Sequence, residues 1–132
     1  PLDDLVRIVR HSLEQGYTVA WAADVTNPGF DARSGLAVLP GENREQKNGW
    51  VTEEMRQEDF NNYSTTDDHL MHITGMAEDE TGDLYFIVKN SHGTFNPYGG
   101  YLYVSVPYFR LRTTSILLHR ESLPDDIGRR LR

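Results

Sequence analysis

The sequence predicts an α+β domain in which a leading helix packs on a twisted antiparallel sheet or partial barrel. Apolar residues recur at helical spacing near the N-terminus, whereas several later segments alternate apolar and polar residues as strands do. The connections between these segments carry turn residues, and short connections favour antiparallel pairing. A length of 132 residues with 38% hydrophobic residues indicates a single domain over residues 1–132.

The first predicted element is a helix over residues 1–15. Asp3 and Asp4 lie in its first turn, where negative charge interacts favourably with the helix dipole, and Gly16 supplies the stop. A strand is predicted over residues 18–25, with one face formed by Val19, Trp21, Ala23 and Val25.

The middle of the chain predicts a long surface excursion and a short helix. Residues 30–50 are rich in Gly, Asn and charge, so we expect a surface segment without regular structure. Thr52 can cap a helix that begins at Glu53, whose buried side would consist of Met55, Phe60 and Tyr63.

We predict a β-hairpin whose two strands lie within residues 67–75 and 83–94 and whose polar turn is residues 78–82. If Ala77 pairs with Leu84, residue 71 lies opposite Asn90, and His69 is one diagonal step from Asn90 on the same face. His72 then lies on the opposite face from His69. This arrangement argues against a metal site formed by the two histidines, because both rings would have to converge.

Two more strands and a polar tail complete the prediction. Residues 101–106 alternate, and the strand stops at Val106-Pro107. Residues 113–119 are the last β-prone run, and residues 123–132 form a polar tail with one helical turn after Pro124.

Composition and charge narrow the partners of the protein. A net charge of −7 has the wrong sign for a nucleic-acid or anionic-membrane surface. No apolar run approaches the ~18 residues of a transmembrane helix, and no signal segment opens the chain. The absence of Cys rules out disulfides and thiolate metal sites in these residues.

From the pattern alone, His69 is a general base, a metal ligand or a structural histidine. Asn90 either accepts a hydrogen bond from the His69 ring or only closes a turn, because Asn is common in turns. An Asn oxygen that binds one imidazole nitrogen fixes the tautomer and leaves the other nitrogen as a base. Ser91 and Ser105 lack a Gly-x-Ser-x-Gly elbow, which argues against a serine hydrolase.

Several motifs resemble the papain-like cysteine peptidases. Asp68-His69-Leu70-Met71 and Ile87-Val88-Lys89-Asn90-Ser91-His92-Gly93-Thr94 are similar to the His and Asn motifs of that family, the second of which usually reads Lys-Asn-Ser-Trp-Gly-Thr. Residues 16–25, the helix at 54–57, Thr65-Thr66 and the ending at 123–127 resemble the bleomycin hydrolase and aminopeptidase C branch. The resemblance runs along nearly the whole chain.

This resemblance implies the β-rich lobe of the papain fold and roles for five residues. His69 acts as acid and base, Asn90 orients its ring, and Leu70 helps line the pocket for a substrate side chain. Asp68 either acts on His69 electrostatically or only solvates the cleft rim. His92 stands where the family usually has a Trp that covers the His–Asn hydrogen bond, and it either fills that position physically or modulates the site.

The family's nucleophile is a Cys upstream of these segments. The resemblance therefore implies that the chain is the C-terminal part of a cysteine-type aminopeptidase, that the nucleophile-bearing N-terminal part is absent, and that these 132 residues alone are inactive. The reaction implied is peptide hydrolysis by thiolate acyl transfer, with no metal or organic cofactor.

The same resemblance implies several partners. They are a peptide substrate, the missing N-terminal part of the same protein, and further copies in a homo-hexameric ring whose C-termini reach into the cleft. It favours a cytoplasmic parent protein, with an exported one as the alternative. A different class of function is also consistent with the absence of Cys: a non-catalytic papain-like domain that binds peptides or a partner protein.

Overall fold

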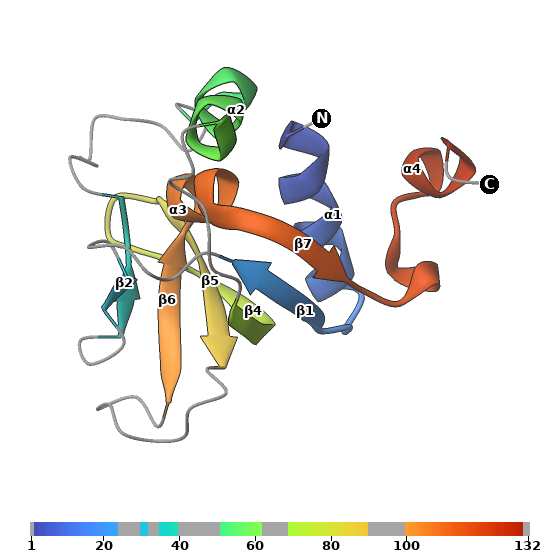
Figure 1. The fold of residues 1–132 in the computed structure, drawn as a ribbon. Helices are drawn as coiled ribbons and strands as arrows, with labels where there is room; N and C mark the ends of the chain where they lie inside the picture. The colour runs from blue at the N-terminus through green and yellow to red at the C-terminus, as the bar shows by residue number, and fades with distance from the viewer. Residues whose placement is uncertain are drawn as a thin grey trace.

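The computed structural model of the chain describes residues 2–23, 30–31, 35–39, 51–61, 69–89 and 100–130. A seven-stranded sheet in the order β2-β3-β6-β5-β4-β1-β7 forms its centre (Figure 1). All neighbouring strands pair antiparallel except β3 and β6, which are parallel. The strands are β1 (Val19–Ala23), β2 (Phe30–Asp31), β3 (Leu36–Ala37), β4 (His69–Glu78), β5 (Leu84–Lys89), β6 (Tyr101–Ser105) and β7 (Thr113–Leu117).

The helices are α1 (Leu2–Glu14), α2 (Glu53–Asn61), α3 (Val106–Arg112), the 3-10 turn η1 (Arg120–Ser122) and α4 (Asp125–Arg130). Helix α1 contacts β1 and β4, helix α3 contacts β5, β6 and β7, and the two helices contact each other, so the core lies between them and one face of the sheet. We call this the inner face. The ring of Phe109 in α3 lies 5.0 Å from Phe86 and 6.0 Å from Trp21, measured between centroids.

Helix α1 confirms the predicted leading helix and its stop. The amide of Tyr17 donates to the carbonyl of Ser12 at 3.0 Å, and the amide of Gly16 donates to that of Leu13 at 3.1 Å. These two bonds form a Schellman motif, which requires the left-handed conformation that Gly16 adopts at φ 85°. The helix therefore ends where the sequence places a residue without a Cβ.

Strand β1 confirms the predicted alternation. Val19, Trp21 and Ala23 are fully buried on the inner face, whereas Ala20 and Ala22 are half-buried on the opposite, outer face. Val25, the fourth residue of the predicted face, lies outside the described residues.

Strands β4 and β5 form the predicted hairpin, but the assumed register is wrong next to the turn. Ala77 pairs with Tyr85 rather than with Leu84, because Glu78 takes the position opposite Leu84. An irregularity between Ile73 and Gly75 then shifts the pairing by one residue, as a β-bulge does. His72 consequently lies opposite Lys89, which is the register that the prediction required at this end of the hairpin.

The prediction of an unstructured excursion over residues 30–50 is wrong in part. Short strand β2 pairs with β3, and β3 joins the sheet beside β6. Ala37 is fully buried and Leu39 is 4% exposed, so this short apolar run belongs to the core. Residues 32–34 and 40–50 lie outside the described residues.

Helix α2 begins at Glu53 as predicted, because the Thr52 hydroxyl accepts a hydrogen bond from the amide of Met55 at 3.2 Å. Met55 packs against the core. The Phe60 side chain and Tyr63 lie outside the described part of the structure.

Helix α3 was not predicted. Ser105 caps it, with its hydroxyl accepting from the amide of Tyr108 at 3.2 Å, and Pro107 lies in the first turn. Both residues are typical of helix starts. The Val106-Pro107 pair therefore ends β6, as expected, by starting a helix.

The C-terminal segment lies against α1, on the side of the molecule where both termini are found (Figure 1). The buried hydroxyls of Ser12 and Ser122 are 2.9 Å apart, and Nδ1 of His11 lies 2.7 Å from the carbonyl oxygen of Ser122. The guanidinium of Arg7 donates to the carboxylate of Asp126 at 2.6 Å. The predicted helical turn after Pro124 corresponds to α4.

The observed class is therefore the predicted one: α+β, with a leading helix and a mostly antiparallel sheet. The sheet is open, since β2 and β7 form its two ends among the described residues. None of the helices that the structure describes is long and apolar enough to cross a membrane.

Candidate active site

His69 is the first residue of β4 and is half-buried. It pairs with Ala23, the last residue of β1, so it lies where two adjacent strands end at the same margin of the sheet. His69 shares the inner face with Met71 and Ile73, which are 2% and 0% exposed. The core below these two residues fixes the side of the strand from which the imidazole projects.

His72 lies on the outer face of β4 and is exposed. The two histidines therefore do not converge, as the strand alternation predicts. Among the residues that the structure describes, no three His, Cys, Asp or Glu side chains are grouped so that they could hold a metal ion.

Leu70 follows His69 and points to the outer face, where its side chain is 62% exposed. Its strand partner is Ala22, which in turn pairs with Ser115 of β7. Ala22 and Ser115 have small side chains, so they cover little of the Leu70 side chain. Leu70 and His69 thus lie on opposite sides of one strand, as the alternation of the predicted strand requires.

The remaining predicted site residues, Asp68, Asn90 and His92, lie outside the described residues. The ladder between β4 and β5 runs as far as His72 and Lys89. The sequence prediction started from Ala77 opposite Leu84 and derived from it that Met71 lies opposite Asn90. The predicted His69–Asn90 contact stays a prediction.

A cavity, lined by both charged and apolar residues, shares no described residue with this site and was not predicted from the sequence. It has a volume of about 450 Å³ and lies between α1, α3 and Leu84. The charged residues that line it are Asp3, Arg7, Arg10, Glu14 and Arg110. Charged residues on an amphipathic helix normally form a solvated face, so their sequence pattern gives no sign of a cavity.

Comparison with known proteins identifies the family. The model of the Peptidase C1-like family matches residues 1–132. A search of curated protein sequences finds no match.

Among solved structures, PepW from Lactobacillus rhamnosis HN001 aligns with a TM-score of 0.69 at 18% identity, over 96% of this chain and 28% of PepW. The bromelain protease from Ananas comosus in complex with the E64 inhibitor aligns with a TM-score of 0.39 at 24% identity, over 67% of this chain and 31% of bromelain. The likeness to PepW shows a shared fold, and the chain spans 28% of the length of PepW. With the family model matching from end to end, this chain belongs to the Peptidase C1-like family.

Proposed function

We propose that the chain is the C-terminal part of a cysteine-type aminopeptidase of the bleomycin hydrolase and aminopeptidase C branch. The observation that carries this proposal is the position of His69 in a chain of the Peptidase C1-like family. A half-buried imidazole at the first residue of a core strand is held in direction by the strand and is still accessible from the margin of the sheet.

In the proposed reaction, a Cys from the part of the protein that precedes this chain supplies the nucleophile. Its thiolate pairs with the imidazolium of His69 and attacks the peptide carbonyl carbon, which forms a C–S bond. His69 then protonates the leaving amine as the C–N bond breaks. Water, deprotonated by His69, hydrolyses the acyl-enzyme and regenerates the thiolate.

Asn90 is proposed to accept a hydrogen bond from the other ring nitrogen of His69. The support is the register of the hairpin, because His72 opposite Lys89 sets the count that would bring residues 71 and 90 opposite each other. Asn90 would then be the diagonal neighbour of His69, with their backbones ~7–8 Å apart across the two strands. At that distance the two side chains can reach each other.

Leu70 is proposed to contact the substrate side chain, and Asp68 and His92 to border the same cleft. The support for Leu70 is its 62% exposure beside His69. Because Leu70 and His69 project from opposite faces, a substrate that contacts both would pass around the end of β4.

The test compares three alanine variants of the full-length gene product. We expect His69→Ala to lower kcat by about a thousandfold or more, because the variant loses both the base and the acid. Asn90→Ala should lower kcat less, by disordering the ring. His72→Ala is the matched control, since His72 lies three residues along the same strand on the other face, and it should retain activity. Full activity in His69→Ala would contradict the proposed role.

The non-catalytic alternative predicts a different result in the same aminopeptidase assay. A domain that only binds peptides or a partner would show no turnover in the unmodified full-length protein. Peptide binding measured on that protein would then distinguish a binding domain from an inactive preparation.

A further inference from the structure

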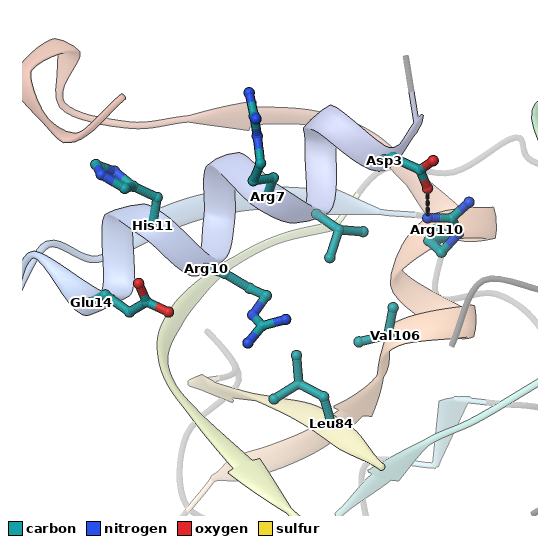
Figure 2. Close-up of a pocket in the computed structure, with 9 residues that line it drawn as sticks. Asp3, Arg7, Arg10, His11, Glu14, Leu84, Val106 and Arg110 are labelled. Atoms are coloured by element: carbon teal, nitrogen blue, oxygen red, sulfur yellow. Dashed lines mark hydrogen bonds and ion pairs between the residues drawn. The ribbon is translucent and has the colours of Figure 1, made fainter. Parts of the chain in front are cut away.

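The cavity between α1 and α3 combines an apolar floor with a charged wall (Figure 2). Leu84 and Val106 form the floor and are 9% and 2% exposed, and Val6 of α1 continues it. The wall is α1, whose charged residues Asp3, Arg10 and Glu14 line the cavity. A volume of about 450 Å³ lies within the range of small-molecule sites.

Most charges around the cavity already have partners. The guanidinium of Arg7 pairs with Asp126, and Nδ1 of His11 contacts the carbonyl oxygen of Ser122. Figure 2 shows both side chains on the side of α1 that faces away from Leu84. Arg110 is held at the end of the cavity by Asp3 at 2.7 Å and by the carbonyl oxygen of Val51. These groups shape the cavity, but their charges are compensated within the chain.

Arg10 and Glu14 are the exceptions among the residues that line the cavity. Neither makes a hydrogen bond or an ion pair in the described structure, with each other or with another residue. The Arg10 side chain extends from α1 toward the floor, with its guanidinium above Leu84, and Glu14 lies one turn further along α1 at the border of the cavity (Figure 2). They are one helical turn apart, so their Cβ atoms are ~5–6 Å from each other. Both residues are exposed, so one positive and one negative group border the open side of the cavity next to its apolar floor.

This pairing of charges selects against ligands with a single charge. A simple carboxylate at Arg10 would lie next to the carboxylate of Glu14, and a simple amine at Glu14 would lie next to the guanidinium of Arg10. A ligand that carries a carboxylate and an ammonium a few ångströms apart satisfies both. A longer peptide separates these two groups too far, whereas a free α-amino acid carries both on one carbon.

We propose that the cavity binds a free apolar amino acid such as L-leucine or L-phenylalanine. The α-carboxylate accepts hydrogen bonds from the guanidinium of Arg10, which can bind it through two parallel N–H groups. The α-ammonium donates to the carboxylate of Glu14. The side chain packs on Leu84 and Val106, where it is removed from water. This inference is independent of the proposed peptidase reaction, because the two sites share no residue.

The direct test is a calorimetric titration of the 132-residue chain with L-leucine. Two analogues serve as ligand controls: 4-methylpentanoate lacks the ammonium, and 3-methylbutylamine lacks the carboxylate. We expect saturable binding of L-leucine and affinities about tenfold or more lower for both analogues. Equal affinity for leucine and either analogue would overturn the proposed recognition, as would no binding at about 10 mM leucine, a concentration that nearly saturates a 1 mM site.

Variants of the two unpaired residues separate this site from weak surface binding. Arg10→Gln and Glu14→Gln should each lower leucine affinity about tenfold or more, since each removes one charge-assisted contact. Arg129→Gln, an exposed arginine outside the cavity, is the matched control and should bind as the unmodified chain does. Circular dichroism checks that each variant is folded. Unchanged affinity in folded Arg10→Gln would overturn the assignment.

Discussion

A chain of two hydrogen bonds around Thr113 connects three elements of the core. The indole N–H of Trp21 in β1 donates to the hydroxyl of Thr113 at 2.7 Å, and this hydroxyl donates to the carbonyl of Phe109 in α3 at 2.5 Å. All three residues are buried. Leaving a buried polar group without a partner costs more free energy than its hydrogen bond contributes. The indole of Trp21 can therefore be buried here because the Thr113 hydroxyl accepts its hydrogen bond.

Thr113→Val should therefore destabilise the protein although the two side chains have nearly the same shape. The variant leaves the Trp21 N–H buried without its acceptor, and we expect the free energy of unfolding to fall by about 1–3 kcal/mol. Thr74→Val is the matched control, because Thr74 is exposed and its contact with the carbonyl of Ile87 is long, at 3.4 Å. Urea unfolding measures both. A loss no larger for Thr113→Val than for Thr74→Val would contradict the role of the hydroxyl.

For single residues, the sequence predicts which face of a strand a side chain occupies better than it predicts which residue that side chain contacts. Alternation placed Val19, Trp21 and Ala23 on one buried face, because a strand has only two sides. It gave no sign of the Trp21–Thr113 bond, whose partners are 92 residues apart. The site follows the same pattern: the motif identifies His69, and the alternation of the predicted strand already places the next residue, Leu70, on the other face.

Among the elements, the bulge in β4 decides which residues face the core. Without it, the register next to the turn would continue and Thr74, not Ile73, would lie opposite Val88. Ile73 is fully buried and Thr74 is exposed. The extra residue therefore restores the alternation that keeps Met71 and His69 on the inner face.

Two single-residue deletions test this role of the bulge. Deleting Thr74 should leave Ile73 opposite Val88 in a regular ladder, whereas deleting Ile73 forces Thr74 into the same buried place. We expect the second deletion to lower the free energy of unfolding by about 2 kcal/mol more than the first, because it exchanges a buried isoleucine for a hydroxyl. Equal losses in urea unfolding would show that Thr74 is not the extra residue.

Helix α3 shows where element prediction from this sequence failed, and helix α2 shows where it succeeded. The cap at Thr52 was recognised, but the equivalent residue Ser105 was placed inside a strand over residues 101–106 and Val106-Pro107 was taken for the end of that strand, because the apolar run of β6 continues into α3. Arg56 of α2 donates to the carbonyls of Arg110 and Thr113 at the end of α3. Burial lowers the pKa of Arg56, yet the guanidinium stays charged and supplies donors to carbonyls that lack helical partners.

Across the whole molecule, polar contacts hold the C-terminal segment to α1. The Ser12–Ser122 contact is buried, and the exposed Arg7–Asp126 ion pair lies beyond it. The hydrogen bond that Arg7 donates to Asp126 raises the pKa of Arg7, but an exposed pair contributes little to stability because water and salt screen it. The segment to residue 130 thus has a defined path along α1. The implied entry of the C-terminus into a cleft, and the implied hexamer, stay predictions.

The central claim is that this chain, of the Peptidase C1-like family, supplies His69 to a Cys elsewhere in the same protein. The most direct test is the intact mass of the native gene product, with and without iodoacetamide, beside an aminopeptidase assay on the same sample and on the 132-residue chain. We predict a species several times heavier than 15.1 kDa that loses activity as it gains one alkyl group, and no turnover by the chain alone. A native species of 15.1 kDa with neither adduct nor turnover would contradict the claim.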